Sequence, residues 1–128
     1  MSALHFPSGP WTGFYTYAGK SGKHRMDLSL SFANGRMTGD GSDPVGLFVI
    51  AGCFDAGSGE CHWTKTYPGA HDVFYRGFRE DKGIWGTWEI QQRARGGFHI
   101  WPLGEENAEE MELIEEEPVE QLIVVPQH

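Results

Sequence analysis

The sequence has few cysteines, no long apolar run and no general excess of basic residues. Two cysteines in 128 residues are too few for the disulfide framework that stabilises small secreted domains. No run approaches the ~18 apolar residues of a membrane-spanning helix, and the N-terminal MSALHFPSGPW lacks the features of a signal peptide. We therefore expect one soluble, cytoplasmic domain that makes no contact with a membrane.

Charge is divided unevenly along the chain. Residues 1–104 contain nine acidic and ten basic residues, whereas residues 105–128 contain nine glutamates and neither lysine nor arginine. The formal net charge of −8 therefore belongs to the C-terminal segment, and the rest lacks the basic excess that nucleic-acid binding requires. The glycines and aromatic residues all lie within 1–104. We predict an N-terminal arm (1–10), a globular domain (11–103) and an acidic tail (104–128).

Apolar and polar residues alternate over most of residues 11–101, which is the period of a β-strand. The clearest strand, 24–33, is followed by Asn34-Gly35, a dipeptide that favours a two-residue type I′ hairpin. That turn would pair Phe32 with Met37. The other expected strands are 11–19, the segment after the hairpin, 45–54, 60–67, 71–78, 83–91 and 96–101. Eight strands with short links predict an all-β fold, an antiparallel up-and-down barrel.

The alternation also predicts which side chains face the interior of this barrel. Most are large and apolar, but Lys65 and the tyrosines are polar, and six glycines (13, 39, 41, 52, 77 and 86) share their face. The predicted interior set is Tyr15, Tyr17, Met26, Leu28, Leu30, Phe32, Met37, Phe48, Ile50, Phe54, Trp63, Lys65, Tyr67, Val73, Tyr75, Ile84, Trp88, Phe98 and Ile100. Because buried polar groups need partners, the polar members indicate an internal network, a position at the barrel mouth or a ligand site. The glycines either fit the taper of the barrel or leave a cavity.

The two cysteines are predicted to remain free thiols. On this alternation Cys53 points outward and Cys61 inward, so that their side chains diverge. A bulge in residues 55–59 would reverse this parity.

A resemblance to known barrels appears in the middle of the sequence, within residues 39–101. The series Trp63, Lys65, Tyr67, Ala70-His71, Tyr75, Gly77 and Trp88 is similar to the middle strands of avidin-like barrels, and the glycine pattern of residues 39–52 resembles small lipocalin-like barrels of the calycin type. In the avidin-like family the corresponding tryptophans line the biotin pocket. The resemblance therefore implies an aromatic wall of Trp63, Tyr75 and Trp88, but the residues that bind the ureido group of biotin have no match here.

We interpret the protein as a barrel that binds a small apolar or aromatic molecule without a covalent bond. Stacking walls and a polar anchor for the ligand would come from Tyr15, Tyr17, Trp63, Lys65, Tyr67, His71, Tyr75 and Trp88. The favoured interpretation of His71 is nevertheless an exposed loop residue, and Asp43, which precedes Pro44, is expected to form an Asx turn. The sequence shows no nucleophile motif, no metal-ligand spacing and no nucleotide signature, so no cofactor or metal is expected.

Two alternatives remain open. One is a cyclase or isomerase that uses Lys65, His71 or a tyrosine as acid or base in the same barrel. The other is an interaction module with a filled core, whose acidic tail recruits a partner. In the tail, residues 119–125 are apolar and β-prone, and they could pair with a sheet edge of this chain or of another, so homo-oligomers through this segment or through barrel faces are expected as partners. Disorder of the tail is the competing interpretation.

Overall fold

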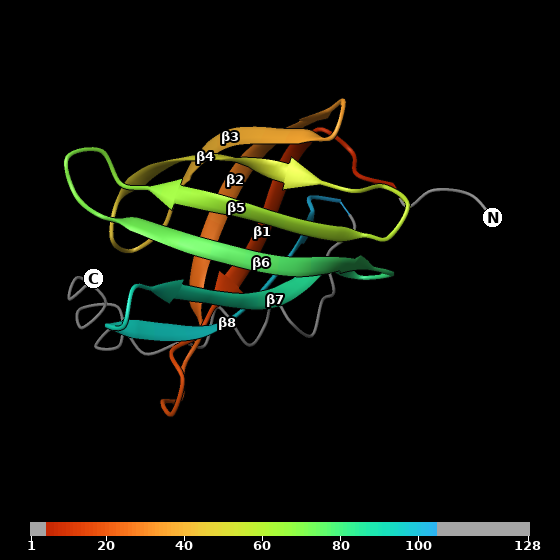
Figure 1. Ribbon diagram of the computed structural model, residues 1–128. Coiled ribbons are helices and arrows are strands. Elements are labelled where there is room, and N and C mark those ends of the chain that lie inside the picture. Colours follow the sequence, from red (N-terminus) through yellow and green to blue (C-terminus); the bar gives the residue numbers. More distant parts are fainter. Residues whose placement is uncertain (1–4, 105–128) are drawn as a thin grey trace.

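The computed structural model describes residues 5–104, which form a closed barrel of eight antiparallel strands and contain no helix (Figure 1). The strands are β1 (Gly9–Tyr15), β2 (His24–Ala33), β3 (Arg36–Ser42), β4 (Leu47–Phe54), β5 (Glu60–Thr66), β6 (Asp72–Glu80), β7 (Gly83–Ile90) and β8 (Ala94–Pro102). Each strand pairs with the next in sequence, and β8 pairs with β1. The predicted all-β, eight-stranded barrel is confirmed. Within the described residues, no helix has the length and apolar character that crossing a membrane requires.

The hairpin between β2 and β3 has the predicted turn and register. Asn34 and Gly35 both have positive φ, 52° and 78°, as a type I′ turn requires. Phe32 lies opposite Met37, and Leu30 opposite Gly39. The apolar alternation of β2 therefore continues across the turn onto β3.

The first strand is shorter than the predicted 11–19. β1 ends at Tyr15, although Thr16 N and Ala18 N still donate to Gly97 O and Arg95 O of β8. Gly19 then adopts a φ of 78°, which turns the chain toward β2. Alternation alone could not locate this end, because the segment keeps its hydrogen bonds to β8 after its pairing with β2 has stopped.

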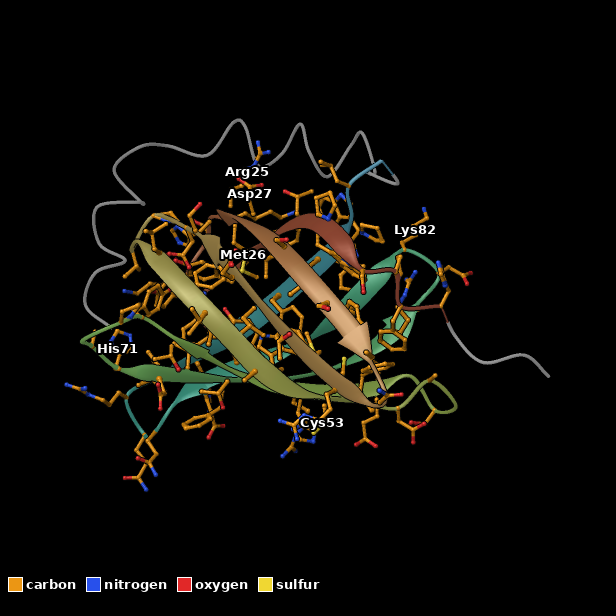
Figure 2. All side chains as sticks on the ribbon, turned by 90° about the horizontal axis from the view of Figure 1, so that it is seen from above. Arg25, Met26, Asp27, Cys53, His71 and Lys82 are labelled. Atoms are coloured by element: carbon orange, nitrogen blue, oxygen red, sulfur yellow. The ribbon has the colours of Figure 1, made fainter. Side chains whose placement is uncertain are left out.

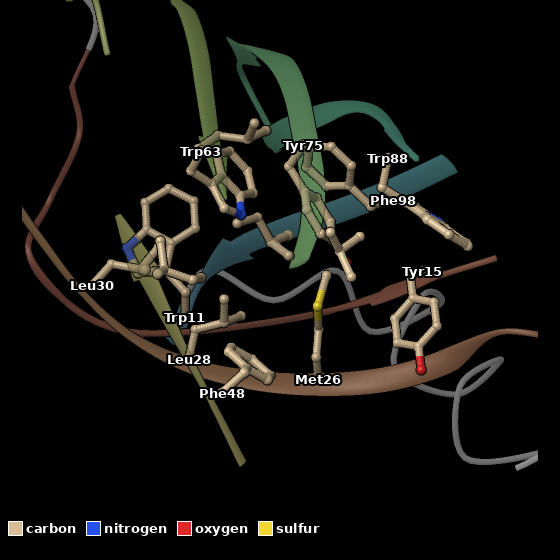
Figure 3. Packing of buried hydrophobic residues seen from close by; sticks show 14 of the residues in the cluster. Trp11, Tyr15, Met26, Leu28, Leu30, Phe48, Trp63, Tyr75, Trp88 and Phe98 are labelled. Atoms are coloured by element: carbon tan, nitrogen blue, oxygen red, sulfur yellow. The ribbon is translucent and has the colours of Figure 1, made fainter. Parts of the chain in front are cut away.

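The predicted interior residues are buried, except for Tyr17, Phe32 and Phe54, which are partly buried and pack against the core. Figure 3 shows Trp63, Tyr75, Trp88 and Phe98 on one side of the barrel, facing residues such as Leu28 and Phe48 on the other. Phe6, Trp11 and Ile90 also belong to this core although the prediction omitted them, and Cys61 belongs to it as its predicted inward direction requires.

The inward glycines allow neighbouring strands to approach closely. A Cβ added at Gly86 would collide with Arg76 O and Gly77 Cα on β6, and one added at Gly52 would collide with His62 O and Trp63 Cα on β5. Gly13, Gly39 and Gly41 meet the backbone of an adjacent strand in the same way. At these positions the glycines therefore serve close strand approach, whereas the prediction offered a fit to the taper of the barrel or a cavity.

The two ends of the barrel differ in chemistry. One end is closed by an aromatic plug, in which the ring of Phe6 lies 5.3 Å from Phe32 and 4.7 Å from Phe54, centroid to centroid. Hydrogen bonds that hold the arm carrying Phe6 include those from Arg79 Nε to His5 O (2.7 Å), from Phe32 N to Ser8 Oγ (2.9 Å) and from Trp11 Nε1 to Pro7 O (2.9 Å). The other end is reached by the β1–β2, β3–β4, β5–β6 and β7–β8 loops, and we call it the polar end. Figure 2 shows His71 at the polar end and Lys82 at the opposite one.

Both cysteines are free, as predicted. Cys53 is exposed on the outer side of β4 (Figure 2). Cys61 is buried on the inner side of β5. Phe54 rather than Cys53 lies opposite Cys61, so no bulge reverses the alternation. Burial raises the pKa of the Cys61 thiol to about 12.

Candidate functional site: a buried ion pair at the polar end

Asp43 is the centre of a hydrogen-bonded cluster inside the polar end. Its Oδ1 accepts from Val45 N (2.9 Å) and Gly46 N (3.3 Å), which is the predicted Asx turn. Its Oδ2 accepts from Lys65 Nζ (2.8 Å) and from the Tyr67 hydroxyl (2.5 Å). The side chains of Asp43 and Lys65 are 0% and 1% exposed. The turn former is thus also the counter-ion of the buried lysine.

The Lys65 ammonium lies inside a box of aromatic rings. Its Nζ is 4.8 Å from the ring centroid of Tyr15, 4.7 Å from Phe48, 5.2 Å from Tyr67 and 5.1 Å from Tyr75. At these distances the ring faces attract a cation. Burial lowers the pKa of Lys65, whereas the adjacent Asp43 carboxylate acts in the opposite direction.

The tyrosines of the cluster are held in their neutral form. Burial is the main cause that raises the pKa values of Tyr15, Tyr17, Tyr67 and Tyr75, and the negative charge of Asp43 raises each of them further. A neutral tyrosine hydroxyl both donates and accepts a hydrogen bond. The polar end therefore offers hydroxyl groups around one buried carboxylate and one buried ammonium.

Tyr17, His24 and Trp88 surround Tyr15 at the polar end. The ring of Tyr17 lies 5.5 Å from His24 and 5.1 Å from Trp88, while that of Tyr15 lies 5.2 Å from His24. Trp88 is fixed by its Nε1, which donates to Thr16 O (2.9 Å). His24 is the first residue of β2 and was not predicted as a site residue, although the alternation of the predicted strand 24–33 places it on the same side as Met26.

His71 lies at the rim, in the loop between β5 and β6. Its ring centroid is 5.3 Å from that of Tyr67, and its carbonyl oxygen accepts from Tyr67 N (3.3 Å). Partial burial lowers the pKa of His71, with a smaller contribution from the positive charge of Arg93. Unlike the exposed loop histidine that was the favoured interpretation, it is partly buried and in contact with the cluster.

Trp63 lies opposite Tyr75 in the register of β5 and β6. Its ring stacks on that of Tyr75 at 5.2 Å and 11°, and it contacts Phe98 at 5.2 Å (Figure 3). It therefore reaches the cluster through Tyr75. The other predicted site residues meet at the polar end, and Asp43 and His24 join them.

The outer surface of the barrel carries depressions of its own. One of about 700 Å³ lies over β5, β6 and β7, and its outward-facing lining includes His62, Phe74 and Arg76. Another, of about 360 Å³, lies beside Trp88 and is lined by residues including Ala18 and Arg95. In residues 5–104 no three His, Cys, Asp or Glu side chains are grouped so that they could hold a metal ion.

Comparison with protein-family models, with curated proteins and with solved structures found no match to this chain. The assignment of a function therefore depends on the chemistry of the polar end.

Proposed function

We propose that the barrel binds a small molecule at its polar end, and that this molecule has an aromatic or apolar body and a polar, preferably anionic, group. The observation that carries the proposal is the buried Asp43–Lys65–Tyr67 cluster within its aromatic box. A buried ion pair is weak evidence for stability, because apolar residues of similar volume often stabilise a core as well or better. Ionisable groups gathered at one end of a barrel are instead typical of a binding or reaction site.

The ligand would meet two kinds of groups. Tyr17 and His71, both partly buried at the rim, would stack against its apolar body. Deeper in the barrel, the Lys65 ammonium has three N–H donors, of which one serves Asp43, and the Tyr67 hydroxyl lies beside it. A carboxylate or other anionic group would exchange with the Asp43 contact at this point. Trp63 would support the site from behind by fixing Tyr75.

We further propose that the barrel is of the calycin or avidin-like type and acts in the cytoplasm. One aromatic plug and one polar end fit an up-and-down barrel that admits a ligand from a single side. The two free thiols are compatible with a reducing compartment.

A second candidate function is acid–base catalysis by the same cluster. Burial lowers the pKa of Lys65, which brings an amine closer to the range in which it can accept a proton at neutral pH. A cyclase or isomerase acting on an apolar substrate would use Lys65 as the base, with Tyr67 as a neutral hydrogen-bond donor.

Binding can be tested with 2-naphthoate as an anionic aromatic probe and 2-naphthol as its neutral counterpart, by isothermal titration calorimetry on the full chain. We expect 2-naphthoate to bind with Kd below about 1 mM, which corresponds to roughly 4 kcal/mol. The Lys65→Met variant should weaken binding by at least about tenfold, or roughly 1.4 kcal/mol. Lys82→Met, which removes a charge at the opposite end, should not change it. Native mass spectrometry of the purified chain would report any molecule retained from the expression host.

The structural effect of Lys65→Met must be separated from its effect on binding. Alone, this variant leaves the Asp43 carboxylate buried without its cation, which should cost about 3–5 kcal/mol of unfolding free energy. The double variant Asp43→Asn, Lys65→Met removes both charges and should recover much of that loss, so it serves as the folded form for the titration. Equal affinity of the double variant and the wild type would contradict the proposal. A loss of affinity in Arg76→Met alone would also contradict it, because that result would place the site on the outer face. The proposal would fail as well if native mass spectrometry found no retained molecule and neither probe bound at about 1 mM.

A further inference from the structure

Four outward-facing side chains where β1 pairs with β8 are buried, although outward-facing side chains on other strands are exposed. Arg25 on β2, Val49 on β4 and Phe74 on β6 face outward and are exposed. By the same alternation, Phe14 and Trp101 also face outward, because Tyr15 and Ile100 point into the core. Yet Phe14 is only 6% exposed and Trp101 only 1%. Thr12 (0%) and His99 (1%), which also face outward, are buried as well.

These residues form a second aromatic cluster, separate from the core. The ring centroids of Phe14 and Trp101 lie 6.2 Å apart, and those of His99 and Trp101 lie 4.8 Å apart. The ring of Trp85 stacks on that of His99 with a centroid distance of 3.6 Å. The Lys23 ammonium lies 4.3 Å above the ring of Phe14. We call Thr12, Phe14, Trp85, His99 and Trp101 the outer aromatic face.

Burial on the outside of a single-layered barrel requires a covering layer. Trp101 adds a more specific indication, since its Nε1 is buried and finds no hydrogen-bond acceptor among residues 5–104. A buried donor without an acceptor costs about 1–3 kcal/mol. A cover that supplies acceptor groups would remove this cost.

We propose that the outer aromatic face is the docking surface of the chain's own residues 105–117. Only Leu103 and Gly104 separate this segment from Pro102, the last residue of β8, which follows Trp101 in the sequence. Within it Ala108, Met111 and Ile114 recur every three residues, which places them along one side of a helix. They would pack on Phe14 and Trp101.

Charge favours the same occupant. Eight of the nine tail glutamates lie within residues 105–117, and no basic residue accompanies them. Lys23 lies over Phe14, and Arg25 is the β2 residue paired with Phe14, so two cations border the face. One anion, Asp27, lies beside them, since its carboxylate binds Arg25 and accepts from Thr12. Glutamates on either side of the apolar stripe would approach these cations and offer carboxylate acceptors to Trp101 Nε1.

The fold also decides how the segment can dock. The barrel is closed, with β8 paired to β1, so it leaves no strand edge for the tail to extend. The expected β-augmentation by residues 119–125 lies outside the described residues, and we propose docking of residues 105–117 through side chains. The glutamates spaced four apart repel one another in an isolated helix, so that the segment would become helical only when it is packed on the face.

The proposal can be tested on the full chain by NMR with ¹³C-methyl methionine. The chain has four methionines, and Met26 and Met37, both buried in the core, provide internal references. We expect the Met111 methyl, assigned through Met111→Leu, to show a ring-current shift and NOEs to the Trp101 indole. Met111→Asp should speed hydrogen exchange of the Trp101 indole by at least tenfold, about 1.4 kcal/mol, whereas Val119→Asp should not.

Three outcomes would overturn the proposal. The first is a Met111 methyl at its peptide shift without NOEs to the barrel. The second is an effect of Val119→Asp in place of Met111→Asp, which would assign the face to the distal part of the tail. The third is NOEs that appear only between differently labelled molecules in a mixed sample, which would make the occupant a second copy of the chain.

Discussion

At the scale of single residues, Asp43 performs two tasks with its two oxygens. Oδ1 accepts from the backbone and fixes the β3–β4 turn, while Oδ2 holds Lys65 and Tyr67. A loop residue thereby determines the charge state of the barrel interior. The same carboxylate raises the pKa of each surrounding tyrosine, so one side chain links the local turn to the electrostatics of the whole cluster.

The tyrosines provide a prediction about pH. All four tyrosines of the chain have raised pKa values in the folded protein, so the folded state retains protons that the unfolded state loses above pH ~10. Their contribution to stability should be complete below that pH and decrease as the pH rises. At about pH 11 a tyrosine in the unfolded chain is roughly 90% ionised. We expect tyrosinate absorbance at that pH to be absent from the folded protein and to appear together with unfolding, followed by circular dichroism.

A guanidinium-unfolded sample titrated in parallel is the control for that experiment. A tyrosine that ionises near pH 10 while the circular dichroism remains native would show that the cluster is open to water.

The sequence predicted part of this site. Alternation placed Lys65 and the tyrosines inside the barrel, because residue parity depends only on strand period. It did not pair Lys65 with Asp43, because that contact joins β5 to a loop 22 residues earlier. A buried lysine does require a counter-charge, and this requirement was the signal from which Asp43 could have been found.

At the scale of elements, the hairpin was the most predictable part and the first strand the least. The register of β2 and β3 followed from Asn34-Gly35, since a two-residue turn fixes every pair beyond it. The end of β1 depended instead on Gly19, where the chain leaves β8. Burial on the outside of β1 and β8 was not predicted at all, because alternation describes one covered side of a strand and these two have both sides covered.

The close approach of β6 and β7 can be tested with alanine. Gly86→Ala places a methyl group against Arg76 O and Gly77 Cα, both backbone atoms that cannot move independently. We expect a loss of about 2–3 kcal/mol in unfolding free energy, as for overpacked cores, measured by urea denaturation. Gly97→Ala on the neighbouring β8 is the matched control, since its methyl would lie at an ordinary 3.6 Å from Gly86 O and Thr16 Oγ1. A similar loss in both variants would show that strand propensity, and not close approach, explains the glycines.

At the scale of the whole molecule, the barrel is closed at one end and polar at the other. Phe6 belongs to no strand, yet it is 8% exposed and contacts Phe32 and Phe54. The N-terminal arm thus completes the core by covering this end of the barrel. Charge and hydroxyl groups are left to the opposite end, where the loops converge.

The plug can be tested by truncating its ring. Phe6→Ala should lower the unfolding free energy by about 3 kcal/mol, the usual cost of removing a buried aromatic side chain. Leu103→Ala changes a residue near the same end that is 52% exposed, so it should stay within about 0.5 kcal/mol of the wild type. Thermal and urea denaturation would measure both. An equally small effect of Phe6→Ala would mean that the arm rests on the barrel without closing it.

The hydrogen bond from Leu103 N to Pro10 O (2.9 Å) joins the residue after β8 to the second residue of β1. The first and last strands are therefore neighbours, and the hydrogen-bonded sheet closes on itself without a free edge strand. A circular permutant, in which a short linker joins residue 103 to residue 9 and the new termini lie in another hairpin turn, would keep the same strand pairings. The order in which the strands are synthesised is thus set by the gene, and we expect the closed barrel to form whichever strand comes first.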